Sequence, residues 1–287
     1  MNAQGGADLP WMLRFLAARS IPGLEQVSPS RYARCIRVND APHLIDITVG
    51  FDNRSGCILE TRAWPPLATR LRESLAAFLF DLGMDLRPYQ RLARGDPILG
   101  PLVERRPGLR IPRLVDPFEG VVRAIVGQVV SIAAARTVVT RIVTCYGDEI
   151  AGLGAERLRT FPLPPRLAGV APAALAKLGL SASKARAIVA CADAFARGDL
   201  ESDHLRSLSS TELDARLMAL PGVGAWTSAY LRMRVWGDRD AFPANDHGVI
   251  AALRQLGVQR DAIPSTAERW RPWRAYATLQ LWASLAD

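Results

Sequence analysis

A tight turn rich in glycine and proline lies in the segment from Leu220 to Tyr230, which reads LPGVGAWTSAY. It separates two apolar helical patterns, so the second helix would begin with backbone N–H groups that have no partner inside that helix. Such amides suit a phosphate group, which can approach closely because Gly222 and Gly224 have no Cβ. An ordinary turn between two helices would contain the same residues. The helical patterns on both sides favour phosphate binding, and therefore a nucleic acid.

A single carboxylate follows at Asp246, in the segment FPANDHG that precedes a helical pattern from His247 to Arg254. Aspartate is a frequent N-cap, because its side chain accepts hydrogen bonds from the first free amides of a helix, and that role alone would explain it. The same position would also fix the direction of a carboxylate that stabilises positive charge during a reaction. The two roles are compatible, and on this position alone capping is the simpler interpretation; His247 is predicted to be a neighbour in the pocket of Asp246 and not a second base.

Aromatic side chains are concentrated around this turn and this acid. Trp226 and Tyr230 are four residues apart and would share one helix face, while Trp282 comes from another helix. A wall of aromatic rings can stack on a base extruded from DNA. It attracts a cationic base by about 0.5–2 kcal/mol more than a neutral one. These three residues are predicted to line a base pocket. The other aromatic residues of this region are predicted to pack in the core: Trp270, Trp273 and Tyr276.

The cysteines give no sign of a metal centre, because they are widely separated and form no Cys-x-x-Cys pair. We expect no iron–sulfur cluster and no zinc, and we expect reduced, buried thiols at Cys35, Cys57, Cys145 and Cys191. No cofactor is expected apart from a monovalent cation, Na⁺ or K⁺, at the turn. Its ligands would be the backbone carbonyls of Met218, Leu220 and Val223.

The elements that must position these groups change character along the chain. Residues 11–20 have an amphipathic helical pattern, and three alternating or β-branched segments follow at 32–38, 43–49 and 56–62, separated by turn residues. With a helical pattern at 67–82 they predict an α+β domain, with a small antiparallel sheet, over residues 1–95. A connection punctuated by proline leads into residues 96–287, which are predicted to be all helical, in two subdomains with the active site in the cleft between them.

Within the helical region, several helices can be placed from their caps and their apolar spacing. An apolar helix is predicted to begin at Asp116 and to run to Arg136. Further helices are predicted near 172–178, 183–197 and 210–219. A last helix is predicted from Arg269 to Trp282, with Pro272 in its first turn.

The composition limits the class of protein. The chain has 287 residues, 49% of them hydrophobic, which is enough for substantial cores. A formal net charge of +8 favours a polyanionic partner, and nearly all the cations are arginine, since Lys177 and Lys184 are the only lysines. No apolar run reaches about 18 residues and no secretory leader is recognisable, so we expect a cytoplasmic protein without a membrane partner.

The turn with Trp226, together with FPANDH at 242–247, resembles the helix-hairpin-helix DNA glycosylases, which have a Gly/Pro-rich loop and a catalytic Asp. Further segments resemble the bacterial DNA-3-methyladenine glycosylase II (AlkA-type) branch, and they span nearly the whole chain: WMLRFLAAR at 11–19, RPGLRIP at 106–112, AIVGQVVS at 124–131 and ERWRPWRAY at 268–276. The resemblance implies a TATA-binding-protein-like half-fold for the N-terminal sheet, with DNA held mainly by the helical region.

Carried onto this chain, the resemblance implies that Asp246 is catalytic and that Trp226, Tyr230 and Trp282 line the pocket. It places Gln128 and Val129 where the family inserts a wedge into the gap left by a flipped nucleotide; that wedge is usually Leu, so Val129 is a departure. The DNA backbone would be bound at the hairpin by Gly222, Val223, Gly224, Ala225 and Thr227. The partner would be damaged double-stranded DNA, bound by a monomer at the bacterial nucleoid.

The reaction implied by the resemblance is excision of alkylated purines, of the 3-methyladenine and 7-methylguanine type, in base excision repair. A cationic purine leaves without a general acid, so one carboxylate would be enough to stabilise an oxocarbenium-like sugar and to position or deprotonate water. A lyase branch of the superfamily has a nucleophilic Lys where this chain has Trp226, so a monofunctional enzyme is predicted. Two alternatives stay open: a non-catalytic DNA-binding protein with the same hairpin, and a glycosylase with AP-lyase activity.

Overall fold

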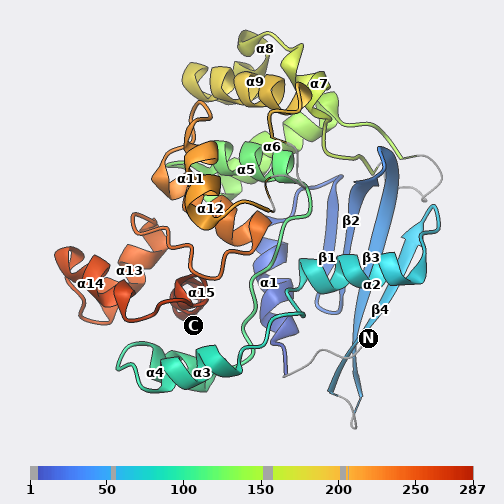
Figure 1. Cartoon of the computed structure of the whole chain (residues 1–287). Helices are drawn as coiled ribbons and strands as arrows, with labels where there is room; N and C mark the ends of the chain where they lie inside the picture. The colour runs from blue at the N-terminus through green and yellow to red at the C-terminus, as the bar shows by residue number, and fades with distance from the viewer. Residues whose placement is uncertain (1–5, 53–55, 151–157, 201–204, 206, 287) are drawn as a thin grey trace.

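The N-terminal region of the computed structural model is a four-stranded antiparallel sheet flanked by helices. The structure describes residues 6–52, 56–150, 158–200, 205 and 207–286. Helix α1 (Leu9–Arg19) precedes strands β1 (Glu25–Ser28), β2 (Arg31–Val38), β3 (Ala41–Asp52) and β4 (Gly56–Trp64), which pair in sequence order, and α2 (Thr69–Leu79) follows. In Figure 1 the sheet stands at one side of the molecule, with α2 lying across it. The predicted α+β region is confirmed.

Turn chemistry sets the register of this sheet. Asn39 and Asp40 both have positive φ, 49° and 62°, which matches the two-residue hairpin that joins β2 to β3. The second predicted turn, at Asp52 and Asn53, lies partly outside the described residues. Strand β1 was not predicted, because its four residues, EQVS, show no apolar alternation.

The two faces of the sheet enter two different hydrophobic cores, because successive side chains of a strand point in opposite directions. Tyr32 and Ile36 of β2 belong to a core with α1 and α2, whereas Ala33 and Cys35 belong to a core with the helices that follow residue 116. The sheet is therefore a layer buried on both sides over β2.

Beyond the sheet the described chain is almost entirely helical, as predicted. The elements are α3 (Arg87–Arg94), α4 (Leu99–Arg105), α5 (Pro117–Gly127), α6 (Ile132–Tyr146), α7 (Pro164–Ala168), α8 (Pro172–Ala176), α9 (Ala182–Ala196), α11 (Ser210–Met218), α12 (Ala225–Leu231), the π-helical turn η1 (Arg232–Trp236), α13 (His247–Gln255), the 3₁₀ turn η2 (Arg260–Ala262), α14 (Ile263–Glu268) and α15 (Arg274–Ser284). An isolated bridge pairs Glu149 with Arg159.

Three boundaries differ from the sequence prediction. The predicted helix from Asp116 to Arg136 is two helices, because Val129 takes φ +55° and Ser131 caps a new helix by accepting from the amide of Ala134. The proline-rich connection contains a helix, α4, and α3 lies just before it; neither was predicted. The last helix begins at Arg274 and not at Arg269, so Pro272 lies before its first turn.

The helical elements divide between the two cores. One core holds α5 to α9 and α11, and the other holds α3, α4 and α13 to α15 together with α1 and α2. Figure 1 shows α5, α6 and α9 above and α13 to α15 below, with α12 between them. The aromatic residues predicted to pack in the core do so: Trp270, Trp273 and Tyr276 are all buried. A domain boundary at residue 95 stays a prediction.

The described thiols differ in burial. Cys35 and Cys191 are free and buried, but Cys145 is exposed, so the expectation of burial is wrong there; the Cys57 side chain lies outside the described residues.

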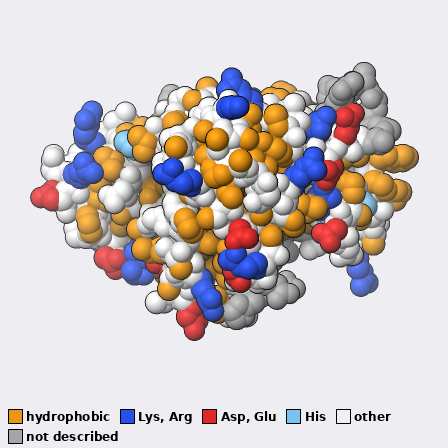
Figure 2. Space-filling model, turned by 90° about the horizontal axis from the view of Figure 1, so that it is seen from above, with side chains coloured by type: hydrophobic (Ala, Val, Ile, Leu, Met, Phe, Trp, Pro, Cys, Tyr) orange, Lys and Arg blue, Asp and Glu red, His pale blue; other side chains and the backbone are white. Residues whose placement is uncertain are grey.

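Within the described ranges, no group of three or more His, Cys, Asp or Glu is placed to hold a metal. None of the described helices is long and apolar enough to cross a membrane. Figure 2 shows Lys and Arg side chains scattered over one face among apolar ones, with no single basic patch.

Candidate active site

The predicted hairpin joins α11 to α12. The N–H of Val223 donates to the carbonyl of Leu220 at 3.1 Å and closes the turn. Gly222 has φ +77°, and a Cβ there would come within 2.7 Å of the Ala187 Cβ, so only glycine fits without a shift. Gly224 is the N-cap of α12, and no side chain caps this helix. The first amides of α12, beginning with Ala225, therefore have no partner from the helix or from a capping side chain.

Not every residue predicted at the hairpin can contact DNA in the same way. The side chains of Val223 and Thr227 are buried, and the Val223 amide is used in the turn. Gly222, Gly224 and Ala225 are exposed. The hairpin can thus offer the amides of Gly224 and Ala225, but not the side chains of Val223 and Thr227.

The carbonyls predicted to hold a cation belong to the end of α11 and to the turn that follows it. Met218 is the last residue of α11, where helix carbonyls have no intrahelical partner, and the Leu220 carbonyl accepts one hydrogen bond from Val223. A carbonyl oxygen has two lone pairs, so Leu220 keeps one for a cation. The oxygen donor set fits a hard monovalent cation.

The loop between α5 and α6 lies against the hairpin. Gln128 Nε2 donates to the carbonyl of Gly222 at 2.8 Å and to Thr227 Oγ1 at 2.9 Å. Val129, the next residue, has 92% of its surface exposed. The two residues predicted at the wedge therefore have different roles in the free protein: Gln128 contacts the hairpin, and Val129 points into solvent.

Asp246 lies at the start of α13 and caps it, because Oδ1 accepts from the Val249 amide at 3.0 Å. Two indole groups also donate to this carboxylate: Trp282 Nε1 to Oδ1 at 2.8 Å and Trp226 Nε1 to Oδ2 at 2.9 Å. All three contacts come from N–H donors, which stabilise negative charge. The capping and the catalytic interpretations of Asp246 are therefore compatible, and the indoles fix the direction of the carboxylate.

The predicted aromatic residues form a continuous wall beside Asp246. Trp226 and Tyr230 are stacked, with ring centroids 5.5 Å apart, and Tyr230 lies 6.3 Å from Trp282. Trp282 in turn stacks on Phe15 of α1 at 6.3 Å. The wall thus combines α12, α15 and α1, and each of its rings is in contact with the next.

A cavity of about 990 Å³ opens in front of this wall. Its lining includes Asp246, the aromatic wall, the exposed His247, and the α5–α6 loop from Gln128 to Ile132. Because the lining draws on elements of both cores, the cavity lies between them. The division of the helical region into two subdomains stays a prediction.

Phe15, Arg19 and Arg234 also line the cavity, although the sequence did not predict them at the site. Phe15 and Arg19 are four apart on α1, and Arg234 comes from η1. The Arg19 guanidinium lies 3.7 Å from the centre of the Phe15 ring, and Arg234 donates to the Tyr230 hydroxyl at 2.9 Å. Burial, together with nearby cations such as Arg234, lowers the pKa of Arg19 to about 10, which leaves it charged at neutral pH. Two signals in the sequence could have found Phe15 and Arg19: their i, i+4 spacing and their place in the family-like segment WMLRFLAAR at 11–19.

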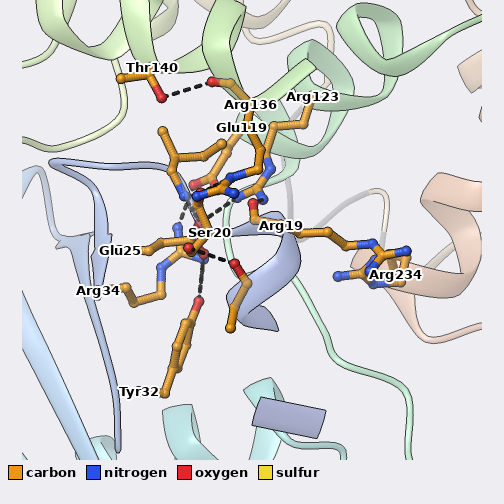
Figure 3. A network of polar contacts seen from close by, with 12 residues as sticks. Arg19, Ser20, Glu25, Tyr32, Arg34, Glu119, Arg123, Arg136, Thr140 and Arg234 are labelled. Atoms are coloured by element: carbon orange, nitrogen blue, oxygen red, sulfur yellow. Dashed lines mark hydrogen bonds and ion pairs between the residues drawn. The ribbon is translucent and has the colours of Figure 1, made fainter. Parts of the chain in front are cut away.

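A buried polar network supports the cavity from the side of the sheet (Figure 3). Arg34 Nη2 of β2 donates to Glu119 of α5 at 2.5 Å, and Arg123 donates to Glu119 at 2.9 Å and to Glu25 at 3.1 Å. Arg123 also donates to the carbonyl of Arg19 at 2.9 Å, and it lines the cavity. The network therefore connects the sheet, α5 and the end of α1 at the cavity wall.

Two family models match the chain. Residues 3–116 match "AlkA N-terminal domain", and residues 122–275 match "HhH-GPD superfamily base excision DNA repair protein".

Known proteins match over nearly the whole chain. It is 34% identical over 282 residues to DNA-3-methyladenine glycosylase 2 of Escherichia coli, covering 98% of this chain and 95% of that one. It is 36% identical over 272 residues to a probable bifunctional transcriptional activator/DNA repair enzyme AlkA of Mycobacterium tuberculosis, of whose length it spans about half (53%). A solved structure of 3-methyladenine DNA-glycosylase from Archaeoglobus fulgidus has the same fold, with a TM-score of 0.81 at 21% identity, covering 99% of this chain and 96% of that one.

Proposed function

This chain belongs to the HhH-GPD superfamily of base excision DNA repair proteins and, within it, to the family of DNA-3-methyladenine glycosylase 2, and we propose that it is a monofunctional DNA glycosylase that excises alkylated purines from duplex DNA. The observation that carries the proposal is a carboxylate, Asp246, held by two indole N–H groups at the wall of an aromatic cavity.

The hydrogen bonds of Asp246 indicate which oxygen would act. Oδ1 accepts from Val249 and Trp282, which uses both of its lone pairs, whereas among the described residues Oδ2 accepts one hydrogen bond, from Trp226. Oδ2 therefore keeps a free lone pair for the sugar or for a water molecule. We assign to Oδ2 the stabilisation of the oxocarbenium-like sugar and the positioning of the attacking water.

The aromatic wall supports a preference for cationic purines. Tyr230 stacks on Trp226, and both rings line the cavity that would receive a flipped base. N3- or N7-alkylation gives the purine a positive charge, which strengthens its attraction to an aromatic face and lets it leave as a neutral molecule. The C1′–N bond breaks, its electron pair stays with the base, and water adds to C1′ with loss of a proton.

The placement of lysine supports hydrolysis without strand cleavage. Lys184 Nζ donates to the backbone carbonyls of Val126 and Gln128, and Lys184 lines a separate, smaller cavity. Lys177 is the exposed C-cap of α8. The residues that line the large cavity include no lysine, so it offers no amine for a Schiff base.

Binding of damaged double-stranded DNA by a monomer is part of the proposal. The amides at the start of α12 would bind a phosphate of the backbone, and Val129 would enter the stack. A Na⁺ or K⁺ on the carbonyls of Met218, Leu220 and Val223 would stiffen the turn. A cytoplasmic location at the nucleoid stays an expectation.

The test of catalysis is Asp246→Asn. We expect release of 3-methyladenine from methylated duplex DNA to fall by about 10³-fold or more, while affinity for the DNA is unchanged or higher. Asparagine keeps an oxygen that can cap α13, so the fold should be retained. The matched control is Asp261→Asn at an exposed position of η2, which should release base at the wild-type rate. Normal release by Asp246→Asn would overturn the assignment of catalysis to Asp246, whereas no release by the wild-type protein would favour the non-catalytic DNA-binding alternative.

The test of monofunctionality uses the same duplex without alkali. We expect intact strands that break only when alkali is added, and no protein–DNA adduct with borohydride. Nicked strands together with a trapped adduct would identify a glycosylase with lyase activity.

A further inference from the structure

The α5–α6 loop holds Val129 in an unusual backbone conformation. Val129 has φ +55°, which a β-branched residue rarely adopts, because its side chain crowds the backbone there. Its side chain is almost fully exposed, and its neighbour Val130 is also exposed. Such a conformation persists only where surrounding contacts enforce it.

Two sets of contacts, both through Gln128, enforce it. On one side Lys184 Nζ, from the first turn of α9, donates to the Gln128 carbonyl at 2.6 Å and to the Val126 carbonyl at 3.0 Å. On the other side the Gln128 side chain donates to Gly222 and Thr227 of the hairpin region. The residue directly before Val129 is therefore attached to α9 through its backbone and to the hairpin through its side chain.

The position of Lys184 suits this contact electrostatically. The last carbonyls of a helix have no intrahelical partner and carry partial negative charge, so an ammonium group is favourable at the end of α5. Lys184 itself is held near the N-terminus of α9, where its amide donates to Ser181 Oγ at 3.3 Å. Burial lowers the pKa of Lys184, in agreement with a side chain that lies against the protein and not in open solvent.

We propose that Lys184 is a positioning residue for base flipping: it holds the α5–α6 loop so that Val129 is already directed into the base stack when DNA binds to the hairpin. The inference rests on the proposed function. A loop fixed in advance loses less conformational freedom on binding, and this compensates for the shorter reach of valine compared with leucine.

The first experiment compares Lys184→Met with Lys184→Arg, and uses Lys177→Met as the matched control for loss of a lysine. Insertion is measured by the fluorescence of 2-aminopurine beside an abasic-site analogue in a duplex, and excision by single-turnover release of 3-methyladenine. We expect Lys184→Met to weaken insertion and slow excision by about 10-fold, the order expected for loss of hydrogen bonds from a charged donor. Lys184→Arg should recover most of both, and Lys177→Met should behave as wild type.

The second experiment separates positioning from phosphate binding and from stability. In a Val129→Ala background, Lys184→Met should change insertion by less than about 2-fold, because the side chain that Lys184 positions has been removed. The logarithm of the DNA-binding constant is plotted against the logarithm of the salt concentration. The slope should stay as in wild type, whereas loss of a phosphate contact would reduce its magnitude by about one. Equal losses in both backgrounds, or a reduced slope, would overturn the inference.

The same measurements distinguish a failure of the proposed role of Lys184 from a failure of the proposed glycosylase function. If wild-type protein inserts into the abasic duplex but releases no base from any alkylated duplex, the proposed function fails. If wild type releases base and Lys184→Met matches it in insertion and excision, the inference fails alone. Thermal unfolding of each variant is monitored by circular dichroism. If insertion and excision are lost only because Lys184→Met is unfolded, that result counts against a positioning role.

Discussion

Asp246 accepts three hydrogen bonds, and two of them come from residues that also form the wall of the cavity. Trp226 and Trp282 therefore present an aromatic surface to a base and fix the carboxylate beside it. The sequence predicted all three residues at the site, from the position of Asp246 before a helix and from the aromatic spacing. It could not predict the indole contacts with the acid, because these depend on how α12, α13 and α15 pack.

Trp282→Phe tests whether the indole N–H of Trp282 helps to hold the carboxylate of Asp246. The variant keeps an aromatic ring but removes the N–H that donates to Oδ1, so the carboxylate loses one of three contacts. We expect single-turnover excision to slow by about 10- to 100-fold, since hydrogen bonds to charged groups contribute about 1.5–3 kcal/mol. Trp64→Phe, at a half-exposed position of β4, is the control and should be neutral. A rate unchanged in Trp282→Phe would mean that Trp226 and Val249 hold the acid alone.

At the scale of elements, the two hairpin glycines differ in backbone conformation and in the space available for a side chain. Gly222 has a positive φ and no room for a Cβ, whereas Gly224 has φ −97° and open space around it. The sequence predicted the turn from both residues together. It could not rank them, because the obstacle at Gly222 is Ala187, a residue of α9 that is distant in the sequence.

Gly222→Ala is therefore expected to lower the free energy of unfolding by about 1–3 kcal/mol and to weaken DNA binding. Gly257→Ala is the control for the backbone term, since Gly257 has φ +83° but nothing within 4 Å of its Cβ position. Gly224→Ala should leave stability nearly unchanged. Thermal melting and binding to an undamaged duplex measure the two effects, and equal losses for Gly222 and Gly257 would exclude a contribution from Ala187.

At the start of α5, the N-cap residue Asp116 makes the free energy of unfolding depend on pH. Burial, with added repulsion from Glu119, raises the pKa of Asp116 to about 6. Since the unfolded chain has the lower pKa, Asp116 favours folding at low pH, and this contribution is lost as pH rises through about 6. Asp116→Asn keeps an oxygen for the Phe118 and Glu119 amides but carries no charge. We expect it to raise the free energy of unfolding by about 1–3 kcal/mol at pH 8 and by little below pH 4. Urea unfolding at both pH values measures this, and a gain independent of pH would contradict it.

At the scale of the whole molecule, charged residues connect the sheet to the helical region. Burial would raise the pKa of Glu25, but Arg123 and Arg34 outweigh it and the net effect lowers that pKa. Arg34 and Glu119 are both almost fully buried and 85 positions apart in the chain. The sequence could not reveal this network, since alternation predicts which strand residues are buried but not which charges will meet.

Arg34→Met would leave Glu25 and Glu119 buried without one of their partners. We expect the free energy of unfolding at pH 7 to fall by about 3–5 kcal/mol. Arg31→Met, on the same strand, removes a partly exposed ion pair with Asp46 and should cost about 1 kcal/mol or less. Chemical denaturation of both variants measures the difference, and similar small losses would mean that Arg123 alone neutralises the two carboxylates.

The stacking of Phe15 on Trp282 brings together residues from the first helix and the last helix. During synthesis on the ribosome, the wall of the cavity cannot form until α15 has emerged, although the hairpin of α11 and α12 is complete well before that. A nascent chain that has not yet released α15 would therefore have the hairpin but not the Trp282 indole that completes the wall and contacts Asp246. The order of the elements along the chain places completion of the aromatic wall after completion of the hairpin.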